Sequence, residues 1–71
     1  MFGFKGTSTP RDMSETFAEE EADLAKRLKA SGNSAKGVRL AVDQLRVTHA
    51  DEAAAAGFGD LAREKHREAG D

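Results

Sequence analysis

Large apolar side chains are scarce in this sequence, and that scarcity limits the folds open to it. The 71 residues include five Leu, four Phe, three Val and two Met, and almost half of all the apolar residues are alanine. A chain this short buries only about 60% of its unfolded surface, so it can form one small domain at most. A core of this size rarely contributes more than about 3–5 kcal/mol, which favours self-association or folding on a partner.

An apolar stripe at helical spacing defines the first predicted element. Its members recur every three or four residues, as one face of a helix requires: Phe17, Glu21, Leu24, Ala25 and Leu28. Thr9 is a suitable N-cap, and Pro10 suits the first helical position, where no N–H donor is needed. We therefore predict a helix over residues 12–31, preceded by an extended N-terminal arm over residues 1–11.

A glycine-rich turn ends this helix and introduces the next. Gly32 or Asn33 can adopt the left-handed conformation that closes a helix, and Ser34 can cap the following one. We predict the second helix over residues 35–49. Its inward face is expected to hold Val38, Ala41, Val42 and Leu45, with Leu40 and Val47 on a neighbouring face.

The remaining residues predict a third helix over 51–68. Thr48 and Asp51 are both plausible caps, so we expect the chain to break or bend between them. Gly57 and Gly59 together cost a helix about 2 kcal/mol relative to alanine. Either the helix persists through these glycines because Phe58 docks, or Asp60 caps a separate last helix.

Together these elements predict an all-α protein. We expect a small helical hairpin or three-helix bundle, formed by a single helical domain over residues 12–71 with the extended arm before it. The 11 basic and 13 acidic side chains nearly cancel, so the net charge of −2 gives no global argument for nucleic acid or membrane binding. We predict no membrane association. The absence of cysteine makes the chain indifferent to the redox compartment, and because no secretory signal is visible, a cytoplasmic location is the default expectation.

Residue types that could support catalysis or metal binding do not converge in the sequence. Neither His49 nor His66 has a second His or Cys at helical spacing, and one nearby carboxylate leaves too few ligands for a metal. We expect His49 to be an exposed or helix-end residue. The acidic run Glu19-Glu20-Glu21-Asp23 is interpreted as a solvated helix face, because consecutive helical positions point about 100° apart. The sequence predicts neither an enzyme nor a bound cofactor or metal.

The apolar stripes favour a non-enzymatic function. We predict a helical protein–protein interaction or assembly protein that is oligomeric and acts by helix-in-groove docking or bundle completion. Its partner would be another copy of itself or a larger protein. The residues expected to bind that partner are those of the three stripes: Phe17, Leu24, Leu28, Val42, Leu45, Phe58 and Leu61.

An alternative comes from the order of the predicted elements. The chain begins with a short alternating segment, followed by a helix, a Gly-x-Ser turn and the run Val38-Arg39-Leu40-Ala41-Val42. Over residues 2–47 this order resembles the ribbon-helix-helix DNA-binding family. The predicted first helix departs from that family in being longer and acidic.

The resemblance implies a dimeric transcriptional regulator or antitoxin, whose acidic C-terminal helix would bind a partner protein. Strand residues Lys5, Thr7 and Thr9 would face the major groove, and Ser34 and Lys36 would touch phosphate at a helix start.

Overall fold

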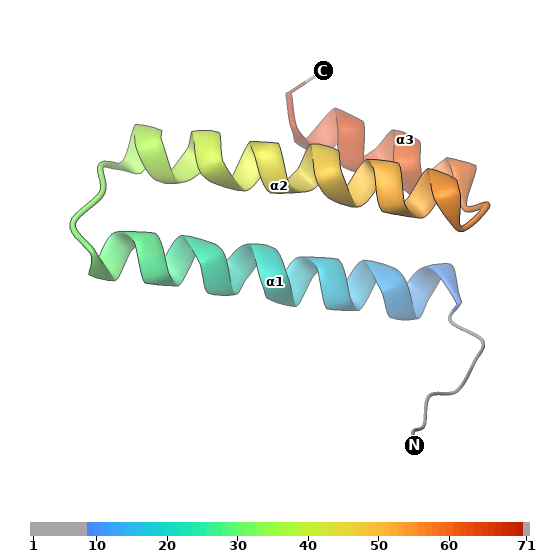
Figure 1. Cartoon of the computed structure of the whole chain (residues 1–71), viewed down its shortest axis with the longest axis horizontal. Coiled ribbons are helices and arrows are strands. Elements are labelled where there is room, and N and C mark those ends of the chain that lie inside the picture. Colours follow the sequence, from blue (N-terminus) through green and yellow to red (C-terminus); the bar gives the residue numbers. More distant parts are fainter. Residues whose placement is uncertain (1–8, 71) are drawn as a thin grey trace.

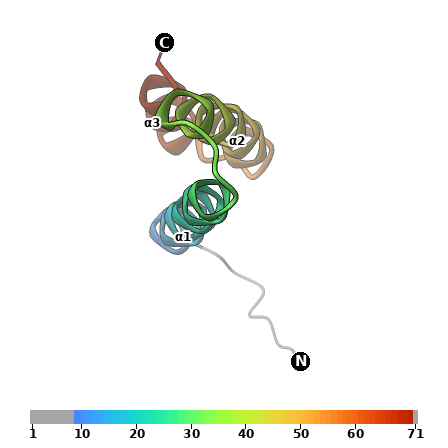
Figure 2. The ribbon, with the colours of Figure 1, turned by 90° about the vertical axis from the view of Figure 1, so that its left-hand side faces the viewer.

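The computed structural model describes residues 9–70, which form three helices in an antiparallel arrangement (Figure 1). These are α1 (Pro10–Ala30), α2 (Ala35–Ala55) and α3 (Gly59–Glu68). The middle helix α2 packs against both of the others. Viewed end-on in Figure 2, α1 lies beneath α2, and α3 lies beside α2. The predicted all-α fold is confirmed over the described residues.

Local signals at the start of α1 and α2 act as predicted. The Thr9 hydroxyl accepts a hydrogen bond from the Asp12 N–H at 3.1 Å, and the Ser34 hydroxyl accepts one from the Gly37 N–H at 3.1 Å. Each bond satisfies one of the donors that a helix N-terminus leaves unpaired. Because α1 begins at Pro10, the predicted arm over residues 1–11 is too long by two residues, and its first eight lie outside the described residues.

The turns after α1 and α2 are closed in the same way. Gly32 and Gly57 have φ angles of +91° and +87°, and the next residue in each turn donates its N–H back to the carbonyl five residues earlier. In the second turn this bond runs from Phe58 to Ala53 at 2.9 Å. This glycine-closed pattern is a Schellman motif, which satisfies the last carbonyls of the helix.

The expected break between Thr48 and Asp51 is wrong, because α2 runs unbroken to Ala55. The Thr48 hydroxyl donates to the Gln44 carbonyl at 3.3 Å, an in-helix bond that removes Thr48 as a cap. The separate last helix does form, but Asp60 does not cap it. Phe58 occupies the N-cap position of α3 and packs against the core.

The apolar core lies where the three helices meet near the beginning of α1. It joins one aromatic side chain of α1 to small and aliphatic residues of α2 and α3: Phe17, Ala53, Leu61 and Ala62, with Met13 and Phe58 packed against them. Alanine at these contacts lets the helix backbones approach closely. The many alanines that limit core size therefore also help the helices to pack.

Candidate interaction surface and buried ionic cluster

Next to the apolar core lies a group of polar and ionisable side chains that we call the buried ionic cluster. One member comes from each helix: Glu21 of α1, His49 of α2 and Lys65 of α3, with exposed fractions of 6%, 1% and 4%. The expectation of an exposed or helix-end His49 is therefore wrong. The expectation of a solvated acidic face is wrong at Glu21.

Glu21 is the centre of this cluster. Its Oε2 lies 2.8 Å from Nδ1 of His49 and 2.7 Å from Nζ of Lys65. Its Oε1 accepts a hydrogen bond from Nε of Arg46 at 3.3 Å. One carboxylate thus connects all three helices, and its burial is compensated by three cationic or proton-donating partners.

The imidazole of His49 is engaged on both edges and on one face. Its Nε2 lies 2.8 Å from Oε1 of Glu20, opposite the contact with Glu21. Neutral imidazole carries one N–H, so both contacts are hydrogen bonds only in the imidazolium form. The ring also stacks on Phe17 with a centroid distance of 4.0 Å and an interplanar angle of 9°. Both ring nitrogens of His49 thus face carboxylate oxygens, and one face of the ring is covered by Phe17.

The same contacts perturb the ionisation of Glu21 and Lys65. Burial raises the pKa of the Glu21 carboxyl, but hydrogen bonds from Lys65 and His49 outweigh burial and leave that pKa below its usual value of 4.5. Burial lowers the pKa of the Lys65 ammonium, but hydrogen bonds to Glu21 and Glu68 leave it above its usual 10.5. Both groups are therefore held in their charged forms.

The polar atoms of this cluster are all satisfied by hydrogen bonds within the chain. Every buried side-chain nitrogen and oxygen within residues 9–70 has a hydrogen-bond partner. The same part of the chain contains no group of three or more His, Cys, Asp or Glu residues placed to hold a metal ion. A satisfied network of this kind fixes which helix faces meet.

Sequence patterns contained a signal for the cluster that our interpretation did not use. Glu21 lies on the apolar stripe of α1, and Lys65 lies four residues after the core residue Leu61 on α3. His49 lies seven residues after the buried Val42 of α2. An ionisable residue at an inward position of each helix predicts that these side chains pair with one another inside the fold.

The residues predicted to bind a partner are divided between interior and surface. Phe17, Val42 and Leu61 are buried within the chain itself. The other four are half-buried: Leu24, Leu28, Leu45 and Phe58. Leu24 and Leu45 line a shallow depression of about 240 Å³ between α1 and α2.

Of the residues expected to bind DNA, Lys5 and Thr7 lie outside the described residues. Thr9 and Ser34 use their hydroxyls as N-caps, and Lys36 is exposed in the first turn of α2.

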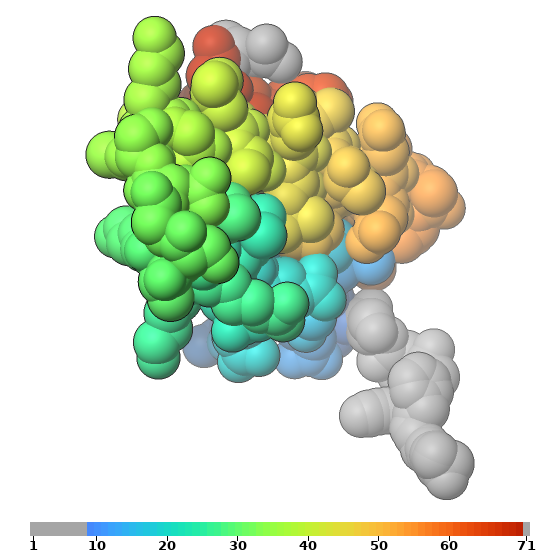
Figure 3. All heavy atoms as spheres, turned by 60° about the vertical axis from the view of Figure 1, so that its left-hand side comes forward, coloured from blue at the N-terminus to red at the C-terminus, as the bar shows by residue number. Residues whose placement is uncertain are grey.

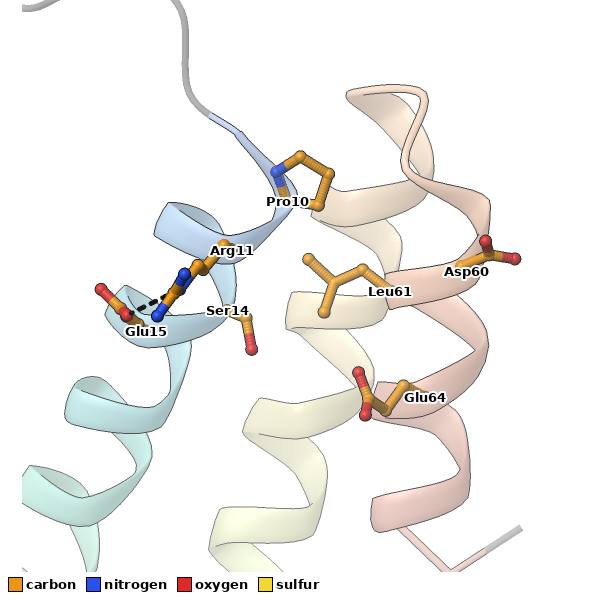
Figure 4. A pocket seen from close by; sticks show the side chains of 7 residues that line it. All are labelled: Pro10, Arg11, Ser14, Glu15, Asp60, Leu61 and Glu64. Carbon is orange, nitrogen blue, oxygen red and sulfur yellow. Dashed lines mark ion pairs between the residues drawn. The ribbon is translucent and has the colours of Figure 1, made fainter.

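A second depression lies between the start of α1 and α3 (Figure 4). It has a volume of about 330 Å³, and Leu61 forms part of its wall beside Pro10 and Ser14. Its rim is charged and includes the exposed Arg11–Glu15 ion pair at 3.6 Å. The side chains around it are mostly solvated, so it is a surface hollow rather than an enclosed ligand site.

The outer face of α2 carries the two exposed large hydrophobic side chains of the described residues. Leu40 and Val47 are exposed by 58% and 40%, and no other large hydrophobic side chain within residues 9–70 is as exposed. They are seven residues apart and so point in nearly the same direction. Figure 3 shows α2 crossing the upper part of the molecule above α1, with its side chains open to solvent. We call the exposed stripe Lys36, Leu40, Val47 and Asp51 the outer face of α2.

Comparison of the chain with protein-family models, curated proteins and solved structures finds no match. Among the described residues, none of the helices combines the length and apolar character that crossing a membrane requires.

Proposed function

We propose that this protein is a non-enzymatic interaction or assembly protein that uses the outer face of α2 to bind another protein. The observation that carries the proposal is the joint exposure of Leu40 and Val47 on one stripe of a 21-residue helix. Leaving both in water forgoes about 1 kcal/mol or more per side chain, which contact with a partner would recover.

The rest of the molecule is suited to presenting this face rigidly. Glu21, His49 and Lys65 link the three helices through contacts of 2.7–2.8 Å. Because α1 and α3 both pack against α2, they leave its outer side open (Figure 2). A preorganised helix face loses less conformational entropy on binding than a flexible segment does.

The proposal can be tested by photocrosslinking in the cells that make the protein. A photoreactive phenylalanine analogue replaces Gln44, an exposed residue between Leu40 and Val47, so that both apolar side chains remain. We expect a covalent adduct from this position. The matched control places the analogue at Lys29, which is exposed on a different helix, α1.

A second control adds Leu40→Lys to the photoreactive chain. Loss of the adduct in this variant supports docking on the outer face, because the helix itself is retained. No adduct from position 44, or an adduct insensitive to Leu40→Lys, contradicts the proposed function.

A dimeric ribbon-helix-helix regulator is retained as the alternative proposal. It rests on the resemblance in sequence, and the exposed Lys36 is compatible with a phosphate contact. This alternative requires binding to duplex DNA that weakens steeply with salt, and loss of sequence preference in a Lys5→Ala, Thr7→Ala double variant. Indifference to DNA at low salt would remove it.

A further inference from the structure

We propose that the partner of the outer face of α2 is a second copy of this chain, docked antiparallel so that Leu40 of each copy meets Val47 of the other. This inference rests on the proposed function and names its partner. The resulting dimer has a twofold axis near the middle of α2, between the levels of Asp43 and Gln44.

The spacing of the outer face fits such an axis. Leu40 and Val47 lie at equal distances on either side of its midpoint, and Lys36 and Asp51 lie four residues farther out at each end. All four positions fall within roughly 60° of one another around the helix. A twofold axis therefore generates two Leu40–Val47 contacts and two Lys36–Asp51 contacts between the copies. Such a pairing of one surface with itself is what a self-complementary interface requires.

Charge determines the direction of the two helices. In the antiparallel register Lys36 of one copy lies opposite Asp51 of the second copy. Both side chains are exposed, and neither forms an ion pair within residues 9–70. A parallel register would instead set Lys36 against Lys36 and Asp51 against Asp51, which like-charge repulsion disfavours.

The residues nearest the twofold axis would not place an unpaired charge inside the dimer interface. Asp43 near the axis is already paired with Arg46 at 2.9 Å and with Arg39 at 3.4 Å. Gln44 is exposed and can hydrogen-bond across the axis or to water. Because one helix face forms the whole contact, the interface belongs to the small, reversible class, and we expect a dissociation constant on the order of 10–100 μM.

The first experiment is sedimentation analysis of the full chain over a concentration series spanning that range. We expect a shift from monomer to dimer. Leu40→Lys should weaken the dimer roughly 100-fold, since two Leu40 contacts are lost by symmetry. The control Lys29→Glu changes charge on α1 and should leave the equilibrium unchanged.

A charge-exchange cycle then tests the register. Lys36→Glu and Asp51→Lys should each weaken the dimer roughly tenfold, because each creates two like-charge contacts. The double variant should recover wild-type affinity. Each single substitution also suits the helix dipole, with an acid near the start of α2 and a base near its end, so helix loss would not explain the weakening.

Disulfide trapping provides a second measurement of direction. The chain contains no cysteine, so Leu40→Cys and Val47→Cys each introduce a unique thiol. Oxidation of an equimolar mixture should give mainly the mixed 40–47 disulfide. Predominance of 40–40 and 47–47 disulfides would overturn the antiparallel register.

The inference and the proposed function can fail separately. A chain that stays monomeric throughout the concentration series overturns the second-copy partner, as does a dimer unaffected by Leu40→Lys. If the photocrosslinked adduct is then larger or smaller than twice the chain mass of 7.6 kDa, the outer face binds a different protein and the proposed function holds. If neither a dimer nor an adduct forms, both are wrong.

Discussion

At the scale of single residues, Glu21 has the largest role in the interior. It is 6% exposed, and its two oxygens contact His49, Lys65 and Arg46. Removing one member of a buried ionic network leaves the remaining charges desolvated without compensation. The stability of the fold should therefore be far more sensitive to Glu21 than to the carboxylates beside it.

Glu21→Gln should lower the free energy of unfolding by about 3–5 kcal/mol, because His49 and Lys65 would lose their common anionic partner. Glu19→Gln is the matched control, since Glu19 is an exposed carboxylate of the same helix, and its effect should stay within about 0.5 kcal/mol. Urea unfolding followed by circular dichroism measures both. Equal effects of the two substitutions would contradict the central role of Glu21.

The pKa shifts predict how stability depends on pH. The folded pKa of Glu21 lies below 4.5, so its contribution is present above pH 4.5 and is lost as pH falls toward the folded pKa. The folded pKa of Lys65 lies above 10.5, so its contribution is present below pH 10.5 and is lost as pH rises through the folded pKa. Urea unfolding midpoints can be measured at pH values above and below both 4.5 and 10.5. We expect the midpoint concentration of urea to decrease in acid below pH 4.5 and in alkali above pH 10.5.

Two variants assign these losses to their groups. Glu21→Gln should flatten the acid decline, and Lys65→Met should flatten the alkaline decline. An acid decline that is equally steep in wild type and Glu21→Gln would mean that other carboxylates cause it.

At the scale of helices and turns, local chemistry allowed most of the fold to be predicted. The capping and turn residues contact only neighbours within a few positions in the sequence: Thr9, Pro10, Gly32 and Ser34. The caps of α1 and α2 and the turn between these helices could therefore be predicted from the sequence. The end of α2 could not, because Thr48 can either cap a helix or bond within one. The choice depended on how Ala50 and Ala53 pack, which the local sequence does not specify.

The turn between α2 and α3 allows a matched test of glycine. At Gly57 φ is +87°, so Gly57→Ala should destabilise the fold by about 1–2 kcal/mol. Gly59 begins α3 without a positive φ, and an added Cβ meets nothing within 4 Å. Gly59→Ala should therefore stabilise by about 0.4–1 kcal/mol through reduced unfolded-state entropy. Thermal unfolding of both variants measures the difference, and shifts of the same sign would contradict the assigned turn geometry.

At the scale of the whole molecule, the side chains that are buried and those that are exposed differ from the sequence-based prediction. The stripes were expected to bind a partner, yet Phe17, Val42 and Leu61 are buried inside the chain. The ionic cluster was missed because Glu21 and His49 are 28 residues apart, and no local period connects them. Burial of a charge becomes predictable only when all three helices are considered together.

Replacing the whole cluster should have a different effect from removing one member. The triple variant Glu21→Met, His49→Leu, Lys65→Met exchanges paired charges for apolar groups of similar size. It should be as stable as wild type or more stable by about 1–4 kcal/mol, because no buried charge remains uncompensated. Urea unfolding of the triple and the three single variants compares them. A triple variant less stable than every single variant would show that the charges themselves hold the helices together.

The long sequence separations within the ionic cluster also have a consequence for the order of folding. Glu21 reaches His49 and Lys65 only after all three helices are in register, whereas the caps and turns of α1 and α2 form locally. Desolvating these charges before their partners arrive would be costly, so we expect the cluster to close after the main folding barrier. Substitution of Glu21 should then accelerate unfolding and leave the refolding rate nearly unchanged. The cluster would then form after the transition state for folding and would determine the lifetime of the native state by slowing unfolding.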